Sequence, residues 1–277
     1  MLNQVKRCKP LLGTFVEVSV VLGSSEDEIN DVVQSIFDSI ENMEKMMSYY
    51  DQSSEVFKLN KYGYNNFIEV SEDLLKVLKF SLKLGEVSEG LFDITVAEKM
   101  VVRKLIKDFG FDYEENSSYK DIIIEGNKVC FTKRTFIDLG GVAKGYIVDK
   151  AMKSFLDSEL DIVINAGGDL KMNKWRGKKA QIRIPNKKKL DKFIEVDMAN
   201  SSIATSAGYN KDILAIFNKK KNSFEKSVDS ISVFAKDCMT CDALTKILFM
   251  LDKKDKMLSE FDVTAFSLNK LGEKNVY

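Results

Sequence analysis

The feature that most constrains the fold is a run of apolar residues spaced as on one face of a helix. Between Ile29 and Met47, apolar side chains recur at intervals of three and four residues, which is the period of an α-helix. Ser24 or Ser25 can cap this helix, and Thr14 to Val21 has the pattern of a strand. We therefore expect the chain to begin with a strand and a long amphipathic helix.

The rest of the chain alternates between helical and extended patterns. A helix is predicted from Ser71, whose hydroxyl can cap it, to just before Gly85, and a hairpin with a glycine turn is predicted around Gly126. Further helices are predicted over residues 142–155 and 239–251, and strands over residues 161–165, 180–184, 193–196, 213–217, 230–234 and 261–268. These patterns indicate an α+β fold with mainly antiparallel sheets packed with helices. No linker or repeat divides the sequence, so we expect a single domain over residues 1–277.

Composition excludes several classes of function. The sequence contains no histidine, which rules out Ser-His-Asp and Cys-His nucleophile pairs and metal sites built on imidazole. Its 42 basic and 42 acidic residues leave no net charge, so we expect no nucleic-acid partner. No apolar run approaches the roughly 18 residues of a membrane span. No cleavage site of a signal peptide follows the basic start, so we expect a cytoplasmic protein.

The densest chemical signal lies where a strand is predicted to turn into a helix, in the segment from Asp138 to Tyr146, DLGGVAKGY. Gly140 and Gly141 let the backbone approach a ligand closely, the helix N-terminus favours anions, and Lys144 adds a positive charge. This arrangement is typical of a phosphate site, although its spacing is neither that of a P-loop nor that of the dinucleotide fingerprint. A glycine turn with a solvated lysine is the alternative.

Three further segments carry polar groups near the ends of predicted elements. Asn165-Ala166-Gly167-Gly168-Asp169 closes a strand, and a plain turn is the simpler interpretation. Asp242 and Thr245 open a helix with oxygen ligands of the kind that suit magnesium. Because Lys246 follows Asp242 by four residues, an ion pair of about 0.3 kcal/mol within the helix is the simpler alternative. Residues 219–221 are all lysine and are predicted to form a solvated turn.

Cysteines and tyrosines offer weaker signals. Cys238 and Cys241 form a Cys-x-x-Cys pair, but the other two cysteines cannot form a second one, so a zinc or redox role is disfavoured. Four cysteines in a chain of this length fit a reducing compartment better than a disulfide framework. Tyr49 and Tyr50 could stack on a planar ligand or belong to the core, and the sequence leaves both interpretations open.

Taken in order, these segments resemble the FAD:protein FMN transferase (ApbE) family over most of the chain. The most specific match is the segment 138–146. The other matches are Leu12-Gly13-Thr14, Met47-Ser48-Tyr49-Tyr50 with Ser54-Glu55 and Leu59-Asn60, Gly90-Leu91-Phe92-Asp93-Ile94-Thr95, residues 165–169 and residues 238–246. Each is weak to moderate alone, but their common order and family-like separations are hard to obtain by chance.

The resemblance implies a T-fold-like α+β architecture that binds FAD in a cleft, with Mg²⁺ at its diphosphate. Members of the family transfer the FMN half of FAD to a threonine or serine hydroxyl of a flavoprotein partner and release AMP. Some instead hydrolyse FAD to FMN and AMP. The implied partners are therefore FAD and an acceptor flavoprotein. The alternative is a flavin-binding protein with little or no catalytic activity.

The resemblance also implies roles for particular residues. Contacts to FAD are assigned to Leu12, Tyr50, Leu91, Phe92, Asp93, Asp138 and Lys144. Magnesium is assigned to the Gly141 carbonyl, the Asp242 carboxylate and Thr245. Catalytic roles are assigned to Asp242, Lys144 and Asp138, with Mg²⁺ and Lys144 neutralising charge on the leaving AMP phosphate. The acceptor's proton could pass to Asp138 or Asp242, or the metal could polarise the hydroxyl.

The sequence departs from the family's pattern in ways that affect the site. Lys246 replaces the threonine expected four residues after the metal-binding aspartate, and Thr245 lies one position early. The usual His-x-x-Asp-Pro segment is missing, and its place falls within residues 212–230. Leu12 stands for a methionine, and Ser206-Ala207-Gly208-Tyr209 interrupts a Ser-Gly motif. Because an ammonium cannot ligate Mg²⁺, either Thr245 or water completes the coordination, or Lys246 replaces part of the cation's charge.

Overall fold

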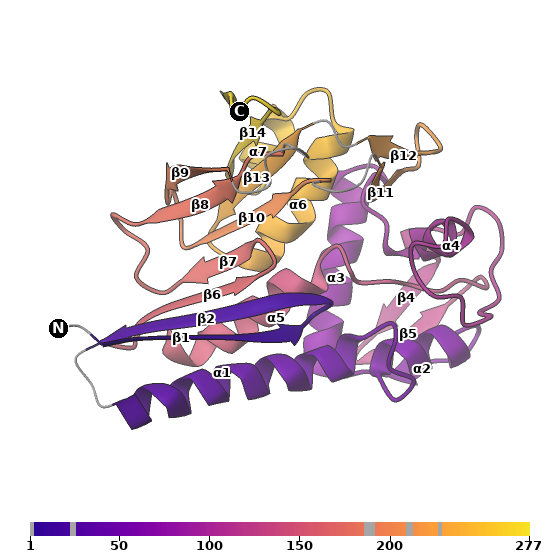
Figure 1. Ribbon diagram of the computed structural model, residues 1–277. Coiled ribbons are helices and arrows are strands. Elements are labelled where there is room, and N and C mark those ends of the chain that lie inside the picture. Colours follow the sequence, from indigo (N-terminus) through magenta and orange to yellow (C-terminus); the bar gives the residue numbers. More distant parts are fainter. Residues whose placement is uncertain (1–2, 23–25, 186–191, 209–212, 227–228) are drawn as a thin grey trace. The chain divides into compact units, whose positions relative to one another are not determined.

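The computed structural model describes residues 3–22, 26–185, 192–208, 213–226 and 229–277 (Figure 1). The chain divides into two compact units, which we name by their content. The sheet unit comprises Met1–Asn42, Lys144–Leu214 and Lys226–Tyr277, and the helical unit comprises Met43–Ala143 and Ala215–Glu225. Because each unit is assembled from separated stretches of the chain, the single domain predicted over residues 1–277 stays a prediction.

The main element of the sheet unit is an eight-stranded sheet with the spatial order β1-β2-β6-β7-β10-β13-β14-β15 (Figure 1). All of its neighbouring strands pair antiparallel. The strands are β1 (Asn3–Leu11), β2 (Thr14–Leu22), β6 (Asp161–Ala166), β7 (Asp169–Met172), β10 (Ser202–Ser206), β13 (Ser230–Ala235), β14 (Thr264–Leu268) and β15 (Lys274–Val276). A separate hairpin is formed by β8 (Lys179–Arg183) and β9 (Phe193–Asp197).

Side-chain alternation explains why these segments form strands. In β2 every second residue, Val16, Val18 and Val20, is fully buried, whereas Phe15 is exposed. A period of two places these valines on one face of the strand, which packs against the core. In the central strand β13 all the side chains are buried, which shows that both faces of the sheet are covered there.

Each face of the sheet is covered by a different element. Helix α6 (Cys238–Met250) packs on β10 and β13, and Figure 1 shows it behind these strands. Ala204, Ala235 and Cys241 meet in this contact, and their small side chains let the helix approach closely. Ile203 and Phe234 point to the opposite face, where they cluster with residues of the β8–β9 hairpin.

The other helices of the sheet unit are α5 (Ala143–Met152), which continues as a 3-10 turn over Lys153–Phe155, and α7 (Asp255–Glu260). Helix α1 (Glu26–Met47) begins in the sheet unit and ends in the helical unit, and it confirms the helix predicted from the apolar spacing. The predicted capping residues, Ser24 and Ser25, lie outside the described residues. Within the described part of the chain, no helix has the length and apolar character needed to cross a membrane.

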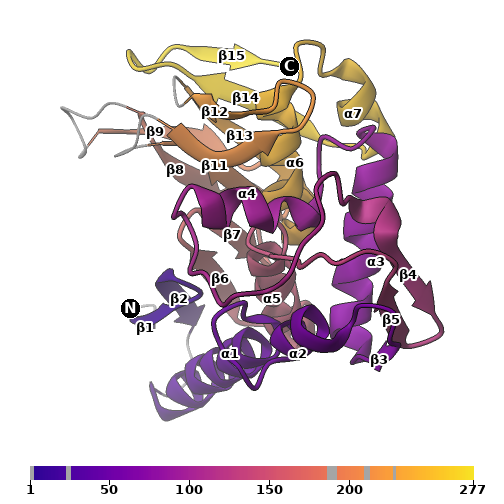
Figure 2. The ribbon, with the colours of Figure 1, turned by 90° about the vertical axis from the view of Figure 1, so that its right-hand side faces the viewer.

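The helical unit combines three helices with a small sheet (Figure 2). Its elements are α2 (Glu55–Tyr62), α3 (Glu72–Val87), α4 (Ala97–Val102), the 3-10 turns η1 (Ile94–Val96) and η2 (Tyr119–Asp121), and the strands β3 (Ile68–Glu69), β4 (Ile122–Glu125) and β5 (Lys128–Phe131) in the order β3-β5-β4. The Ser71 hydroxyl caps α3, as predicted, by accepting a hydrogen bond from Leu74 N at 3.2 Å. The two strands β11 (Ile213–Asn218) and β12 (Ser223–Lys226) form a further hairpin.

The predicted fold class, α+β with mainly antiparallel sheets, is confirmed, and the differences have physical causes. Helix α3 does not end before Gly85, because this glycine serves packing and not termination: a Cβ there would lie 2.6 Å from the Tyr119 ring. The strand predicted from Phe261 begins only at Thr264, because Phe261 ends α7 and Asp262 has a φ of 49°. Strand β1 was not predicted, since its lysines and arginine suit an exposed edge strand.

Candidate functional site

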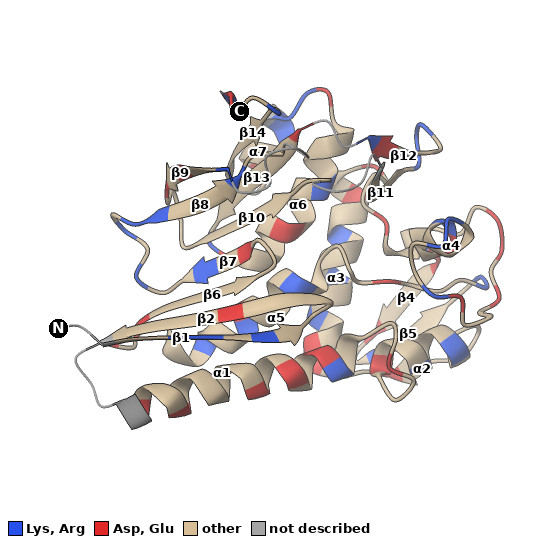
Figure 3. Cartoon of the chain, in the orientation of Figure 1, with Lys and Arg blue, Asp and Glu red and all other residues tan. Residues whose placement is uncertain are grey.

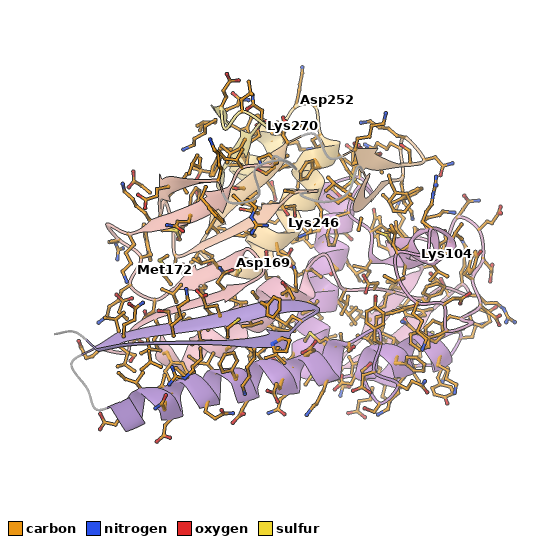
Figure 4. The ribbon with its side chains drawn as sticks, in the orientation of Figure 1. Lys104, Asp169, Met172, Lys246, Asp252 and Lys270 are labelled. Atoms are coloured by element: carbon orange, nitrogen blue, oxygen red, sulfur yellow. The ribbon has the colours of Figure 1, made fainter. Side chains whose placement is uncertain are left out.

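Four charged side chains from three elements of the sheet unit meet in one place. Lys144 lies in the first turn of α5, Asp169 is the first residue of β7, and Asp242 and Lys246 lie one turn apart in α6. We call these four residues the charge cluster, and Figure 4 labels two of them, Asp169 and Lys246. The sequence predicted roles for Lys144 and Asp242, whereas the segment ending in Asp169 was interpreted as a turn.

The cluster is built around the Asp242 carboxylate. Its Oδ2 accepts hydrogen bonds from Lys144 Nζ at 3.1 Å and from Gly145 N at 3.3 Å. Its Oδ1 accepts one from Lys246 Nζ, which also donates to the Asp242 carbonyl oxygen at 2.8 Å. Lys144 Nζ bridges to Asp169 Oδ2 at 2.5 Å. Both oxygens of Asp242 are therefore already engaged with cationic groups.

Burial separates the two signs of charge. The side chains of Asp242 and Asp169 are 0% and 4% exposed, whereas those of Lys144 and Lys246 are 27% and 18% exposed. The carboxylates thus lie inside, and the ammonium groups that pair with them keep partial access to solvent. Such an arrangement can present positive charge to an anion without leaving a buried charge unpaired.

The pKa values follow from this packing. Burial would raise the pKa of Asp242, but the attraction of Lys144 and Lys246 outweighs burial and lowers the pKa to about 2. Burial and the nearby charge of Asp242 raise the pKa of Asp169, against the opposing attraction of Lys144. Burial would lower the pKa of Lys144, but its two carboxylate partners raise it above its usual value. Asp242 and Lys144 are therefore both charged at neutral pH.

Two glycines allow the backbones around the cluster to approach each other. A Cβ at Gly145 would lie 2.3 Å from the carbonyl oxygen of Cys238, so only glycine lets α5 lie this close to the start of α6. Gly167 has a φ of +62°, and a Cβ there would lie 2.4 Å from Oγ1 of Thr14. The predicted glycine motifs therefore serve backbone packing at these two positions.

Asp149 is a positioning residue that the sequence did not reveal. Its two carboxylate oxygens accept hydrogen bonds from the backbone N–H groups of Cys238 and Met239, both at 2.9 Å, which fixes α5 to the first turn of α6. Lys171, a buried residue of β7, donates to Asp149 Oδ1 at 2.7 Å. Burial raises the pKa of Asp149 in spite of this attraction. The N-terminus of α6 is thus occupied by protein groups.

Thr245 uses its hydroxyl within the protein. Its Oγ1 donates to the Asp242 carbonyl oxygen at 2.7 Å and lies 2.7 Å from the Ser206 Oγ. The residue is fully buried. This structure therefore directs the hydroxyl to the backbone of α6 and to β10.

The oxygen atoms available at Asp242 do not form a coordination site that fits a magnesium ion. Magnesium needs an octahedral set of oxygen ligands, usually one or two carboxylates with water and phosphate oxygens. Here both oxygens of Asp242 are paired with lysines, and Thr245 is used elsewhere. Among the described residues, no group of three or more acidic or cysteine side chains could hold a metal.

In the helical unit, the two predicted aromatic residues separate into a core residue and an exposed one. Tyr49 is buried and donates its hydroxyl to the Lys107 carbonyl oxygen at 2.9 Å, whereas Tyr50 is 56% exposed. Burial, and then the charge of Asp138, raise the pKa values of both phenols. Tyr50 is thus a neutral, accessible ring of the kind that stacks on a planar group.

The Asp138 carboxylate forms a hydrogen bond within its own segment. Its Oδ2 accepts a hydrogen bond from Gly140 N at 3.1 Å, while its backbone N–H donates to the Ile94 carbonyl oxygen at 3.1 Å. A Cβ at Gly141 would lie 3.5 Å from the Phe92 ring, an ordinary van der Waals distance. The segment from Asp138 to Tyr146 is divided: residues 138–143 belong to the helical unit, whereas Lys144 and Gly145 belong to the sheet unit, where both donate hydrogen bonds to Asp242.

Most of the other residues predicted to contact FAD are buried in the protein. Leu91 and Phe92 are buried, and the Asp93 side chain is fully buried. Asp93 Oδ1 accepts from Thr95 N at 2.9 Å and from Thr95 Oγ1 at 2.7 Å, and Oδ2 accepts from Lys219 Nζ at 2.6 Å. Leu12 lies at the β1–β2 turn of the sheet unit with a φ of 56°. Asp93 thus organises its own loop.

The helical unit contains a pocket of about 510 Å³ that sequence reasoning did not find. It is lined by Glu86, Glu89, Gly90, Asp93, Ser118, Tyr119, Lys120, Lys219 and Lys220. Lys219, expected in a solvated turn, instead pairs with the buried Asp93 and donates to the Ser117 carbonyl oxygen at 2.9 Å, so that expectation was wrong for this residue. Lys220 and Lys221 keep exposed side chains, as expected.

The Cys-x-x-Cys pair is structural. Cys238 and Cys241 are fully buried in α6, and burial raises the pKa of both thiols. A high pKa leaves little thiolate, which is the form that binds metal or reacts with disulfides. The sequence interpretation that disfavoured zinc and redox roles stays a prediction.

Comparison with known proteins identifies a matching family and several similar proteins. The family model that matches it is described as the ApbE family and spans residues 12–266. An FAD:protein FMN transferase of Vibrio cholerae is 23% identical over 293 aligned positions, covering 92% of this chain and 84% of that protein. One from Haemophilus influenzae is 24% identical, covering 85% of this chain and 75% of that protein.

Solved structures agree in fold. The flavin transferase ApbE from Vibrio cholerae superposes with a TM-score of 0.82 at 19% identity and covers 100% of this chain and 97% of its own. The ApbE protein of Thermotoga maritima superposes with a TM-score of 0.78 at 21% identity and covers 99% of this chain and 97% of its own. Likeness at this level of identity shows the fold.

Proposed function

Because the chain belongs to the ApbE family, we propose that it transfers FMN from FAD to a threonine or serine hydroxyl of a partner flavoprotein and releases AMP. The single observation that carries the site assignment is the pair of ammonium groups, Lys144 and Lys246, which are partly exposed above two buried carboxylates. A diphosphate is the part of FAD that such a pair would bind.

The reaction needs no nucleophile from this chain. The acceptor hydroxyl oxygen attacks the phosphorus of the FMN half, and a new P–O bond forms. The bond from that phosphorus to the bridging oxygen breaks, and AMP leaves with the bridging oxygen. The hydroxyl proton passes to a base or to water. Negative charge grows on the AMP phosphate during this step, and fixed cations beside it would lower the barrier.

We assign roles within the charge cluster on this basis. Lys144 and Lys246 would hold the diphosphate and neutralise the developing charge, and Asp242 and Asp169 would orient the two ammonium groups. Asp242, with its pKa lowered to about 2, is ionised but has no oxygen free of a lysine. Asp138 remains the candidate base among the predicted catalytic residues.

The flavin itself would be bound by other predicted residues. The exposed ring of Tyr50 is suited to stacking on the planar isoalloxazine or adenine ring. The contacts of Leu12, Leu91 and Phe92 with FAD stay predictions. Asp93 would act by holding the loop of Leu91 and Phe92 in place. The predicted magnesium at Gly141, Asp242 and Thr245 stays a prediction. We give it no part in the reaction, because both carboxylate oxygens of Asp242 already accept hydrogen bonds from lysines.

A second candidate is a flavin-binding protein with little or no transfer activity. The missing His-x-x-Asp-Pro segment and the lysine at position 246 favour it. Hydrolysis of FAD to FMN and AMP by water in place of the acceptor is the remaining outcome. The predicted cytoplasmic location stays a prediction.

Incubating the purified protein with FAD and an acceptor peptide that contains threonine distinguishes these functions. We expect AMP release together with a peptide heavier by one FMN group, measured by chromatography and mass spectrometry. Lys144→Met should remove most of this activity, whereas Lys179→Gln, which alters an exposed lysine of β8, should not change it. AMP without labelled peptide would indicate a hydrolase. Retained FAD with neither product would indicate the binding protein.

A further inference from the structure

Lys246 contacts the buried Asp242 carboxylate and itself keeps partial access to solvent. Its ammonium donates to Oδ1 and to the carbonyl oxygen of the same aspartate, which forms a clamp within one helical turn. The Lys246 side chain is 18% exposed and that of Asp242 is 0% exposed. Figure 3 shows basic and acidic positions near each other on α6 within an otherwise uncharged ribbon.

The charge cluster is already balanced. It contains two carboxylates, Asp169 and Asp242, and two ammonium groups, Lys144 and Lys246. A divalent cation on Asp242 would have to displace Lys246 from Oδ1, because Oδ2 is held by Lys144 and Gly145. The displaced ammonium and the ion would then leave the cluster with two positive charges in excess in a largely buried place, which is electrostatically unfavourable.

The ammonium groups still have donor capacity. Each lysine carries three N–H donors. Lys246 uses two of them on Asp242, and Lys144 uses two, on Asp169 and Asp242. Counting partners among the described residues, one donor remains on each partly exposed group. Two N–H donors and two positive charges are therefore available to an anion that lies against the cluster.

From these observations we infer that Lys246 is a built-in cation: its ammonium occupies the position of a divalent ion on Asp242 and, with Lys144, binds the diphosphate of the substrate directly. The cluster accordingly holds no divalent metal on Asp242. The nature of the anion rests on the proposed function, whereas the occupation of Asp242 by Lys246 does not.

Manganese binding tests the occupation of Asp242 independently of activity. Mn²⁺ is titrated into the full chain, and the free ion is measured by electron paramagnetic resonance. We expect wild-type protein to have no binding site that depends on Asp242. Lys246→Ala should create one, because it frees Oδ1, and the double variant Lys246→Ala/Asp242→Asn should lose it again.

The single variant is expected to fold, because Lys144 still pairs with Asp242, and circular dichroism checks this. If Lys246→Ala does not fold, Lys246→Thr serves as the second variant. A wild-type Mn²⁺ site that disappears in Asp242→Asn would overturn the inference. A folded Lys246→Ala or Lys246→Thr protein that binds no Mn²⁺ would do so as well.

Calorimetry with inorganic pyrophosphate in the presence of EDTA tests the anion site. We expect wild-type protein to bind pyrophosphate without metal, and Lys246→Ala to weaken binding by about tenfold, the equivalent of one charged hydrogen bond. Lys246→Arg keeps the charge and should retain most of the affinity. Equal affinity in Lys246→Ala and wild type would contradict the inference.

These outcomes can be separated from failure of the proposed function. If no flavin transfer is found but the manganese and pyrophosphate results are as expected, the built-in cation stands and the transferase proposal fails. If transfer is found and depends on an Mn²⁺ or Mg²⁺ ion bound by wild-type Asp242, the transferase proposal stands and the built-in cation is rejected.

Discussion

Lys219 donates a hydrogen bond to Asp93 at 2.6 Å, although 126 residues separate the two along the chain. The Asp93 side chain is fully buried, and Lys219 is the cation that compensates its charge. This pair ties the hairpin β11–β12 to the loop that carries Leu91 and Phe92.

Lys219→Met should therefore destabilise the protein by about 3 kcal/mol, because it leaves a buried carboxylate without its cation. Lys220→Met is the matched control: it removes an exposed ion pair with Glu89 and should change the free energy of unfolding by less than about 0.5 kcal/mol. Urea unfolding followed by circular dichroism measures both. Equal effects of the two variants would show that the buried pair contributes nothing.

Gly145→Ala should destabilise the protein by about 3 kcal/mol, because its Cβ would overlap the carbonyl oxygen of Cys238, a backbone atom that cannot rotate away. Gly141→Ala is the comparison, since its Cβ would meet only the Phe92 ring at 3.5 Å. Thermal unfolding should give a clearly lower midpoint for the first variant and a midpoint near that of wild type for the second. The reverse order would contradict the packing described here.

Asp138→Asn should lower the pKa of Tyr50 towards the ordinary value of a phenol. The sign follows from charge: the carboxylate repels the phenolate and so raises the pKa, and its removal favours ionisation. Burial, the larger cause, is unchanged, so part of the shift should remain. Ultraviolet absorbance during alkaline titration measures the pKa, and the same titration of Tyr50→Phe identifies which signal belongs to Tyr50. An unchanged titration would place Asp138 away from the ring.

A thiol reagent should modify one cysteine of the native protein quickly. Cys8 is exposed, whereas Cys130, Cys238 and Cys241 are buried. Dithionitrobenzoate should therefore release one equivalent of chromophore from native protein and four from protein unfolded in guanidinium, since the sequence has four cysteines. Cys8→Ser should lose the rapid phase. A rapid phase in that variant would mean that β5, which holds Cys130, or α6, which holds Cys238 and Cys241, opens readily.

Much of the fold follows from local sequence patterns. The helix period of α1, the Ser71 cap of α3 and the glycine turn between β4 and β5 each depend on neighbouring residues, and each is present where it was predicted. Strand β1 was missed because its partner and its exposed edge, and not its own apolar pattern, make it a strand. The end of α3 was predicted too early for a related reason. Gly85 is required by its packing against Tyr119, a residue distant in the chain.

The candidate site divides in the same way. Lys144 and Asp242 stood out because they lie in recognisable motifs, and the structure brings them within 3.1 Å of each other. Asp149 and Lys219 carry no local signal, because their significance comes from buried partners far along the chain. An ion pair between Asp242 and Lys246 was the simpler alternative in the sequence interpretation, as a common feature of helix surfaces. In the structure this pair is largely buried, and it interacts with charged residues of β7 and α5. The spacing of Asp242 and Lys246 in the sequence could not predict this burial.

Lys246 and the aspartate it covers belong to the same helix and lie four residues apart. If Lys246 is the built-in cation inferred above, then exchanging this one residue would change whether the cluster requires a divalent ion, while the helix that carries both side chains stays in place.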